Sequence, residues 1–121
     1  IEMSEQMNAE SLARTWIDCW NAGKPDDIPL AANFKHSSPF GVIEGRDKYL
    51  EVVKPMAAEN VASLKVLKTL SQGNEAVIWF EMTTENGTVP SCDWVHTKNG
   101  EIVSIQSFYD ASSLPHKDDK Y

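Results

Sequence analysis

Two Asn-Gly dipeptides, Asn86-Gly87 and Asn99-Gly100, bracket one short segment and constrain the fold more than any other feature of the chain. Asn-Gly between apolar runs is a strong hairpin signal, because both residues tolerate the positive φ angles that tight turns need. The bracketed residues 89–97 are therefore expected to form the central strand of a three-stranded antiparallel meander. Its two neighbours are expected at residues 76–82 and 102–109.

Asp93 lies in the middle of this central strand. Aspartate is disfavoured in strands, and its burial costs several kcal/mol unless the carboxyl group is partnered or protonated. We therefore expect Asp93 to be a polar anchor inside a ligand cavity. Its pKa should lie above that of a free aspartic acid, because Phe80 and Val95 desolvate it. An Asp93→Asn variant should then lose the decline in stability that a raised pKa produces as pH rises.

A two-residue loop at Asn86-Gly87 decides which side chains share a face of the sheet. The predicted opposite pairs are Asp93 with Phe80, Val95 with Ile78, and Ser91 with Met82. One face, the predicted cavity face, then carries Ile78, Phe80, Met82, Ser91, Asp93 and Val95. The outer face carries Trp79, Glu81, Cys92, Trp94 and His96, with Trp79 opposite Trp94. Such an apolar face needs a cover, so we expect a homodimer joined through Trp79 and Trp94.

The loop at Asn99-Gly100 leaves two registers open for the last strand, because a shift of one residue exchanges its two faces. A two-residue turn places one set of residues on the face of Asp93: Gln106, Phe108 and Asp110. A three-residue loop with a glycine bulge places another set there: Ile105, Ser107 and Tyr109. The second set gives the more apolar interior, and we favour it.

Three helical segments are expected in the first half of the chain. Apolar residues recur at helical spacing over residues 4–22, and Gly23 follows as a natural stop. A short helical segment is expected from Pro25, which suits the first position of a helix. A third helix is expected after Gly45, and Pro55 should kink or end it.

Strands are expected at residues 34–38 and 62–71, the second with a bulge near Val66-Leu67. Helices and one short strand come first and a long antiparallel sheet follows, which is an α+β pattern. The length of 121 residues predicts a single domain over 1–121, with a core from about 4 to 110 and a polar tail at 111–121.

Composition argues against several classes of partner and cofactor. A net charge of −7 disfavours nucleic-acid binding, and no apolar run is long enough to span a membrane. His36, His96 and His116 lack metal-ligand spacing, and no phosphate or dinucleotide motif is present, so neither a metal nor a cofactor is expected. Cys19 and Cys92 lie in apolar contexts and are expected to be reduced thiols of a cytoplasmic protein.

Several short motifs follow one another in a characteristic order. They are Trp16-Ile17-Asp18-Cys19-Trp20-Asn21-Ala22-Gly23, Ser37-Ser38-Pro39-Phe40-Gly41 with Gly45-Arg46, Asn74-Glu75-Ala76-Val77-Ile78-Trp79-Phe80, Asn99-Gly100-Glu101-Ile102 and Phe108-Tyr109-Asp110. From about residue 9 to 110 the chain thus resembles the nuclear transport factor two-like superfamily, near its SnoaL-like and ketosteroid isomerase-like branches. The resemblance implies a cone-shaped, curved antiparallel sheet, wrapped by about three N-terminal helices around an internal cavity.

The resemblance also implies which catalytic positions this chain lacks. Ketosteroid isomerases use a tyrosine, a protonated aspartic acid and an aspartate base. The tyrosine position corresponds to Trp16, the base position to Ser38 and the donor acid to Asp93. The arginine of limonene-epoxide-hydrolase-like members corresponds to Ser91. Their second aspartate, and the last-strand base of SnoaL-like cyclases, correspond to Ser107. The resemblance therefore argues against steroid isomerisation and epoxide hydrolysis.

Two classes of function stay open. The first is an acid–base enzyme of isomerase, cyclase or lyase type acting on a hydrophobic carbonyl compound, with Asp93 as donor and His36 as base. Asp110 is a weaker base candidate, since it lies roughly 14 Å along a flat strand from the position opposite Asp93. The alternative is a non-catalytic ligand-binding or dimerisation module with a vestigial cavity. In either case a small hydrophobic ligand is expected to contact Trp16, Ser38, Phe40, Ile78, Phe80, Met82, Ser91, Val95, Ser107 and Tyr109.

Overall fold

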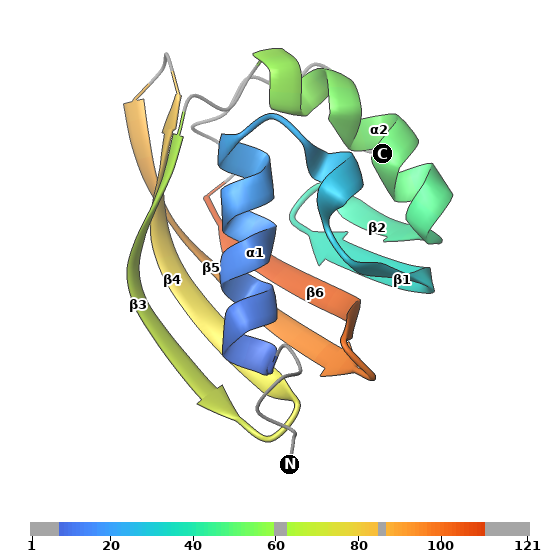
Figure 1. Cartoon of the computed structure of the whole chain (residues 1–121). Coiled ribbons are helices and arrows are strands. Elements are labelled where there is room, and N and C mark those ends of the chain that lie inside the picture. The colour runs from blue at the N-terminus through green and yellow to red at the C-terminus, as the bar shows by residue number, and fades with distance from the viewer. Residues whose placement is uncertain (1–7, 60–62, 85–86, 111–121) are drawn as a thin grey trace.

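The computed structural model describes residues 8–59, 63–84 and 87–110, which form two α-helices, one 3-10 turn and a six-stranded sheet (Figure 1). In chain order the elements are α1 (Ala9–Asn21), η2 (Pro25–Asp27), β1 (Leu30–Ser38), β2 (Gly41–Glu44), α2 (Arg46–Glu59), β3 (Ser63–Gln72), β4 (Glu75–Thr84), β5 (Gly87–Lys98) and β6 (Glu101–Tyr109). Within these ranges, no helix combines the length and apolar character that a membrane crossing requires.

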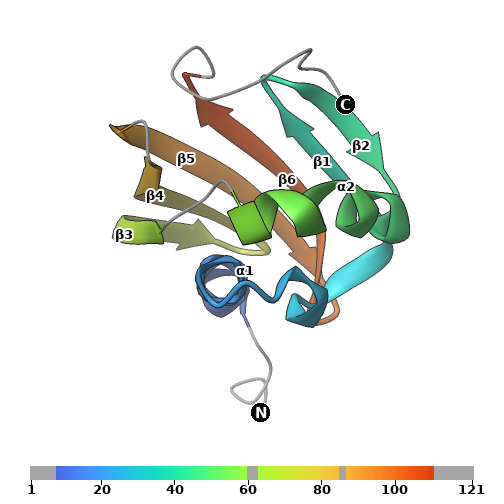
Figure 2. The same ribbon diagram turned by 90° about the horizontal axis from the view of Figure 1, so that it is seen from above.

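The strands lie in the order β2-β1-β6-β5-β4-β3. All neighbours are antiparallel except β1 and β6, which are parallel, so the prediction of a wholly antiparallel sheet was wrong at this pair. The sheet is strongly curved and open at its edges. Helix α1 lies along its concave side, and α2 lies beside β1 and β2 (Figures 1 and 2). The fold is therefore α+β, as predicted, with the helices on the inner side of the sheet.

The first helix begins where a polar side chain satisfies its free backbone N–H groups. Asn8 is the N-cap, and its side chain accepts a hydrogen bond from the backbone N–H of Ser11 at 2.8 Å. Gly23, with a φ of 72°, follows the end of α1 as predicted. Residues 25–27 form only a 3-10 turn, so the count of three helices was too high by one. The predicted helical residues 4–7 lie outside the described ranges.

Helix α2 continues through Pro55 to Glu59, so of the two predicted effects of Pro55, a kink or an end of the helix, the second does not occur. Proline lacks the N–H that would bond to the carbonyl group of Glu51. Both Pro55 and Glu51 are exposed to solvent, so water can hydrate that carbonyl group. The helix is anchored by its opposite side, where Tyr49 and Val53 are buried.

Two features of the early strands differ from the prediction, and one agrees. Strand β1 begins at Leu30 rather than at residue 34, and the short strand β2 was not predicted. Only Ile43 of β2 is buried, so its sequence carries almost no alternating signal. The predicted bulge in β3 is confirmed. Val66 pairs with Phe80 and Lys68 with Trp79, which leaves Leu67 unpaired.

The pairing of β4 with β5 is shifted by two residues from the prediction. Asp93 lies opposite Ile78 rather than Phe80, because Gly87 is already paired with Thr84 as the first residue of β5. Likewise, the observed partners are Ser91 with Phe80, Val95 with Ala76, and Met82 with Val89. A shift of two residues keeps each side chain on its face. All six residues predicted for the cavity face are accordingly buried.

The shift also separates the two outer tryptophans. Trp79 lies opposite Cys92, and Trp94 lies opposite Val77, so the predicted Trp79–Trp94 pair does not form. Both side chains nevertheless lie on the outer face, where Trp79 is 51% and Trp94 37% exposed.

The last hairpin places the favoured set of residues on the face of Asp93, but its turn differs from the predicted one. Asn99 and Gly100 have φ angles of 54° and 81° and form a two-residue turn between Lys98 and Glu101. The register then shifts between Thr97 and His96, so that Ile105, Ser107 and Tyr109 share the face of Asp93. The predicted face is confirmed, but its cause is a bulge within the strand rather than a three-residue loop.

Candidate functional site

Asp93 is held at the centre of the concave face by neighbours from three elements. It is only 3% exposed, with Ile78 of β4 and Ser107 of β6 directly opposite. The indole Nε1 of Trp16, on α1, donates a hydrogen bond to its Oδ2 at 2.8 Å. A second side-chain hydrogen bond links the carboxyl group to Ser107. The polar group is therefore satisfied inside an apolar core, as buried polar groups must be.

Ser107 also connects Asp93 to His36. The Nε2 of His36, on β1, lies 3.0 Å from the Oγ of Ser107, and both side chains are buried. The parallel pairing of β1 with β6 makes this contact, because it places His36 opposite Ile105, two residues before Ser107. Trp16, Asp93, Ser107 and His36 thus form a continuous series of hydrogen-bonded side chains, which we call the polar chain.

Aromatic rings fix the position of the His36 imidazole. Its ring centroid lies 5.1 Å from that of Tyr49, 5.9 Å from that of Trp16 and 6.4 Å from that of Phe34. The His36 and Phe34 rings are nearly parallel, with an interplanar angle of 16°. Because α1, α2 and β1 each supply rings to this cluster, the imidazole has little freedom to turn away from Ser107.

Burial shifts the two titratable groups of the polar chain in opposite directions. Desolvation raises the pKa of Asp93 from 3.8 to about 6, although the hydrogen bonds from Ser107 and Trp16 oppose this shift. Desolvation lowers the pKa of His36 from 6.5 to about 4. At pH 7 Asp93 is mainly ionised and His36 is neutral. The predicted rise in the pKa of Asp93 agrees with this environment.

The single hydroxyl proton of Ser107 determines the tautomer of His36. When Asp93 is ionised, Ser107 donates its proton to the carboxylate, so the Nε2–H of His36 must donate to Ser107. The Nδ1 atom of His36 then carries a lone pair, and within the described ranges this buried atom has no hydrogen-bond partner. His36 therefore cannot accept the Ser107 proton in this state. This geometry differs from a Ser-His-Asp triad, in which the carboxylate orients the histidine.

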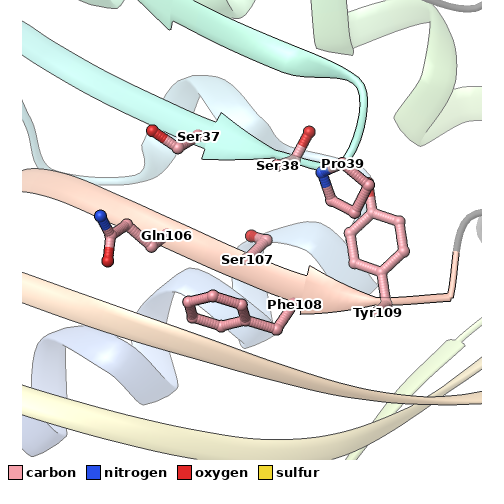
Figure 3. Close-up of a pocket in the computed structure, with 7 residues that line it drawn as sticks. All are labelled: Ser37, Ser38, Pro39, Gln106, Ser107, Phe108 and Tyr109. Atoms are coloured by element: carbon pink, nitrogen blue, oxygen red, sulfur yellow. The ribbon is translucent and has the colours of Figure 1, made fainter.

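A pocket of about 430 Å³ lies at the ends of β1 and β6 (Figure 3). Seven residues line it: Ser37, Ser38, Pro39, Gln106, Ser107, Phe108 and Tyr109. Ser107 belongs to both the pocket wall and the polar chain. Asp93 and His36 are therefore each one hydrogen bond from a residue that lines the pocket.

The predicted ligand contacts divide into three groups. Trp16 and Ser107 belong to the polar chain, while Ser38 and Tyr109 line the pocket, with the Phe40 ring 6.1 Å from that of Tyr109. The remaining predicted contacts are buried in the interior: Ile78, Phe80, Met82, Ser91 and Val95. A cavity enclosed by this last group stays a prediction. Asp110 is exposed beyond the end of β6.

Sequence reasoning missed part of the site. It did not identify Gln106 and Phe108 as pocket residues, because their role depends on where two distant strands stop pairing. It also missed Phe34 and Tyr49 as the packing partners of His36. The alternation of Phe34 and His36 along β1 was a usable signal for a shared face. In the part of the chain that the structure describes, no cluster of three or more potential metal-ligating side chains occurs.

Comparison with known proteins agrees with this architecture. The family model of the SnoaL-like domain matches residues 13–105. No curated protein sequence matches the chain. Similar structures include an NTF2-like protein of unknown function from Cytophaga hutchinsonii, with 22% identity, coverage of 88% of this chain and 94% of the other, and a TM-score of 0.76.

Two further similar structures have names that refer to chemistry. One is a proposed SnoaL-like polyketide cyclase from Jannaschia sp., with 12% identity, coverage of 89% of each chain and a TM-score of 0.74. The other is a proposed ketosteroid isomerase from Kribbella flavida, with 19% identity, coverage of 93% of this chain and 85% of the other, and a TM-score of 0.72. At such identities the likeness concerns the fold.

Proposed function

Since the chain belongs to the SnoaL-like domain family, we propose that it binds a small hydrophobic carbonyl compound and that Asp93 exchanges a proton with it. The observation that carries this proposal is the buried Asp93 carboxyl group, which is hydrogen-bonded to Ser107, a residue that lines the pocket. Perturbed carboxyl groups of this kind concentrate at functional sites. The names of the similar cyclase and isomerase structures support carbonyl chemistry as the reaction class.

The proton would move through Ser107. Neutral Asp93 donates its proton to Ser107 Oγ, while Ser107 donates its own hydroxyl proton to a carbonyl oxygen in the pocket. The products of this step are the Asp93 carboxylate, an unchanged serine hydroxyl and a protonated carbonyl group, so protons and charge balance. The reverse step removes a proton from an enol oxygen. A pKa of about 6 suits both directions near neutral pH, because a general acid or base is most effective when its pKa lies near the operating pH.

His36 has a different role in this proposal from the base that the sequence predicted. A pKa of about 4 makes the neutral imidazole a weak base. Its Nε2–H instead holds the Ser107 hydroxyl group in line between the pocket and Asp93. We therefore assign His36 as a positioning residue, and Trp16 as the donor that holds the other side of the carboxyl group.

Proton exchange tests the proposal without knowledge of the natural substrate. Protonation of the carbonyl oxygen acidifies the adjacent C–H group, whose proton is taken up by solvent water. The wild-type protein in D₂O should therefore accelerate deuterium incorporation beside the carbonyl group of at least one member of a panel of hydrophobic ketones, followed by NMR. Asp93→Asn should return the rate to the uncatalysed level, because an amide is neither a general acid nor a general base at this pH. Asp47→Asn, the same substitution at an exposed residue, should keep the wild-type rate. An Asp93→Asn variant as active as wild type would contradict the proposal.

A second candidate function is a non-catalytic binding or dimerisation module. One observation in its favour is that Asp93 alone titrates near neutral pH within the polar chain, so the chain offers no second acid or base for catalysis. It is also favoured by the outer sheet face, where Trp79, Trp94 and Phe108 are 37–53% exposed. A second copy of the chain could cover that face by two-fold symmetry.

The homodimer can be tested by substitution of one tryptophan. Trp94→Glu places a charge at the centre of the outer face and should give a monomer by sedimentation at micromolar concentration, whereas wild type should sediment as a dimer. Ser11→Glu, at an exposed site on α1, should remain dimeric. Wild-type protein that sediments as a monomer would rule out this interface.

A further inference from the structure

The pocket at the ends of β1 and β6 is bordered by side chains from both faces of the sheet. Along β6, Gln106 and Phe108 are exposed on the outer side, whereas Ser107 is buried on the side of Asp93. Figure 3 shows Gln106 and Phe108 extending to the same side of β6. All three residues line the same pocket. The pocket therefore borders residues of the outer face and also Ser107, whose side chain lies on the side of Asp93.

The strands provide the room for this opening. The parallel pairing of β1 with β6 stops at Ser37 and Gln106, and β1 then ends at Ser38. Pro39 follows and has no N–H to continue the ladder, and the chain turns into β2. Strand β6 continues to Tyr109, whose ring points toward Pro39 in Figure 3 and lies 6.1 Å from the ring of Phe40. Because the ends of β1 and β6 are not paired with each other, there is an opening between them.

The wall of this pocket favours an uncharged ligand. Among the residues that the structure describes, its lining consists of three serines, one glutamine, one tyrosine, one phenylalanine and one proline, and includes no charged residue. An anion would find no cationic partner there, and the Asp93 carboxylate behind Ser107 would repel it. The net charge of −7 acts in the same direction. The wall therefore favours an uncharged ligand over an anion.

We propose that this pocket binds an uncharged aromatic compound carrying a hydroxyl or carbonyl oxygen, which enters from the outer face of the sheet. This inference rests on the proposed function in placing the ligand oxygen at Ser107. The aromatic part lies against the rings of Phe108 and Tyr109, since ring contacts of this kind are favourable. The volume of about 430 Å³ is in the range typical of small-molecule sites. Gln106, exposed at the outer end, contributes to ligand selection.

Two naphthalene derivatives test the charge preference. At neutral pH 2-naphthol is uncharged and 2-naphthoate is an anion of similar shape. In an amide NMR titration, 2-naphthol should shift the signals of Ser37, Gln106, Ser107 and Phe108, and it should bind at least tenfold more tightly than 2-naphthoate. Equal affinity for both compounds, or shifts confined to residues outside the pocket, would overturn the proposal.

A change of charge at the outer end tests the position of the site. Gln106→Lys supplies the missing cation at an exposed residue, so it should strengthen 2-naphthoate binding at least tenfold. Gln72→Lys, the same substitution at an exposed residue of β3, should leave binding unchanged. Equal effects of the two substitutions would overturn the assignment.

The proposed function can fail separately from this site. Asp93→Asn should still bind 2-naphthol, because an amide can accept from Trp16 and keep a hydrogen bond with Ser107. Wild-type protein that binds 2-naphthol at the pocket but exchanges no ketone proton would support the site and contradict the catalytic role of Asp93. Proton exchange without 2-naphthol binding would support the catalytic role of Asp93 and contradict the proposed ligand site.

Discussion

An Asp93→Asn variant should become more stable by about 3 kcal/mol as pH rises from 4 to 7, whereas wild type should change little. The substitution leaves His36 as the strongly shifted group. Its pKa is about 4 in the folded chain and about 6.5 when unfolded, so over this interval the unfolded chain binds a proton that the folded chain does not. The stability that neutral His36 contributes is present above its unfolded pKa and is lost as pH falls towards the folded value.

In the wild type, Asp93 acts in the opposite direction. Its pKa is about 6 in the folded chain and 3.8 as the ordinary value, so the folded chain holds a proton that the unfolded chain has released. The stability contributed by the neutral acid is present below pH 3.8 and is lost as pH rises to about 6. The two contributions nearly cancel. From Asp93 alone, the free energy of unfolding of the wild type was expected to decline as pH rises. The opposite contribution of His36 is expected to cancel this decline.

Denaturant unfolding at a series of pH values measures this effect. The matched control is the double variant Asp93→Asn/His36→Phe, which lacks both groups and should give a profile as flat as that of wild type. An Asp93→Asn profile parallel to wild type would show that Asp93 does not titrate in the folded protein in this interval.

His36→Phe should show the mirror image. Phenylalanine keeps the ring packing against Phe34 and Tyr49 but removes the titrating group. Only Asp93 then remains shifted, so the free energy of unfolding should fall by about 2 kcal/mol from pH 4 to 7. The same denaturant series measures it. A His36→Phe profile that stays flat would contradict the assignment of opposite shifts to the two buried groups.

The faces of the meander could be predicted because side chains alternate between the two faces along each strand, and a shift of two residues preserves this alternation. Alternation along β4 and β5 placed Ile78, Phe80 and Asp93 on one face, and the two-residue error in register did not change that result. The exact pairs could not be predicted, since they depend on which residues connect the strands. Likewise, the bulge in the last hairpin has no local signal in the sequence, although its consequence for Ser107 and Tyr109 agreed with the more apolar alternative.

The candidate site was predictable only in part, for a similar reason. Asp93 is conspicuous because a carboxylate in a central strand needs a partner. Its contact with Trp16 joins residues 77 positions apart, and the contact between His36 and Ser107 joins residues 71 positions apart. The second contact requires β1 to pair in parallel with β6, and no turn motif reports such a pairing. The pocket depends on where that same pairing stops.

The central claim is that Asp93 is a buried carboxyl group whose pKa is raised by desolvation. An NMR titration of the Asp93 side-chain carboxyl carbon, assigned by comparison with Asp93→Asn, measures this property directly in the folded protein. The midpoint is expected near pH 6. A midpoint near the ordinary value of 3.8 would contradict the central claim, and with it the proposed role of Asp93 in proton exchange.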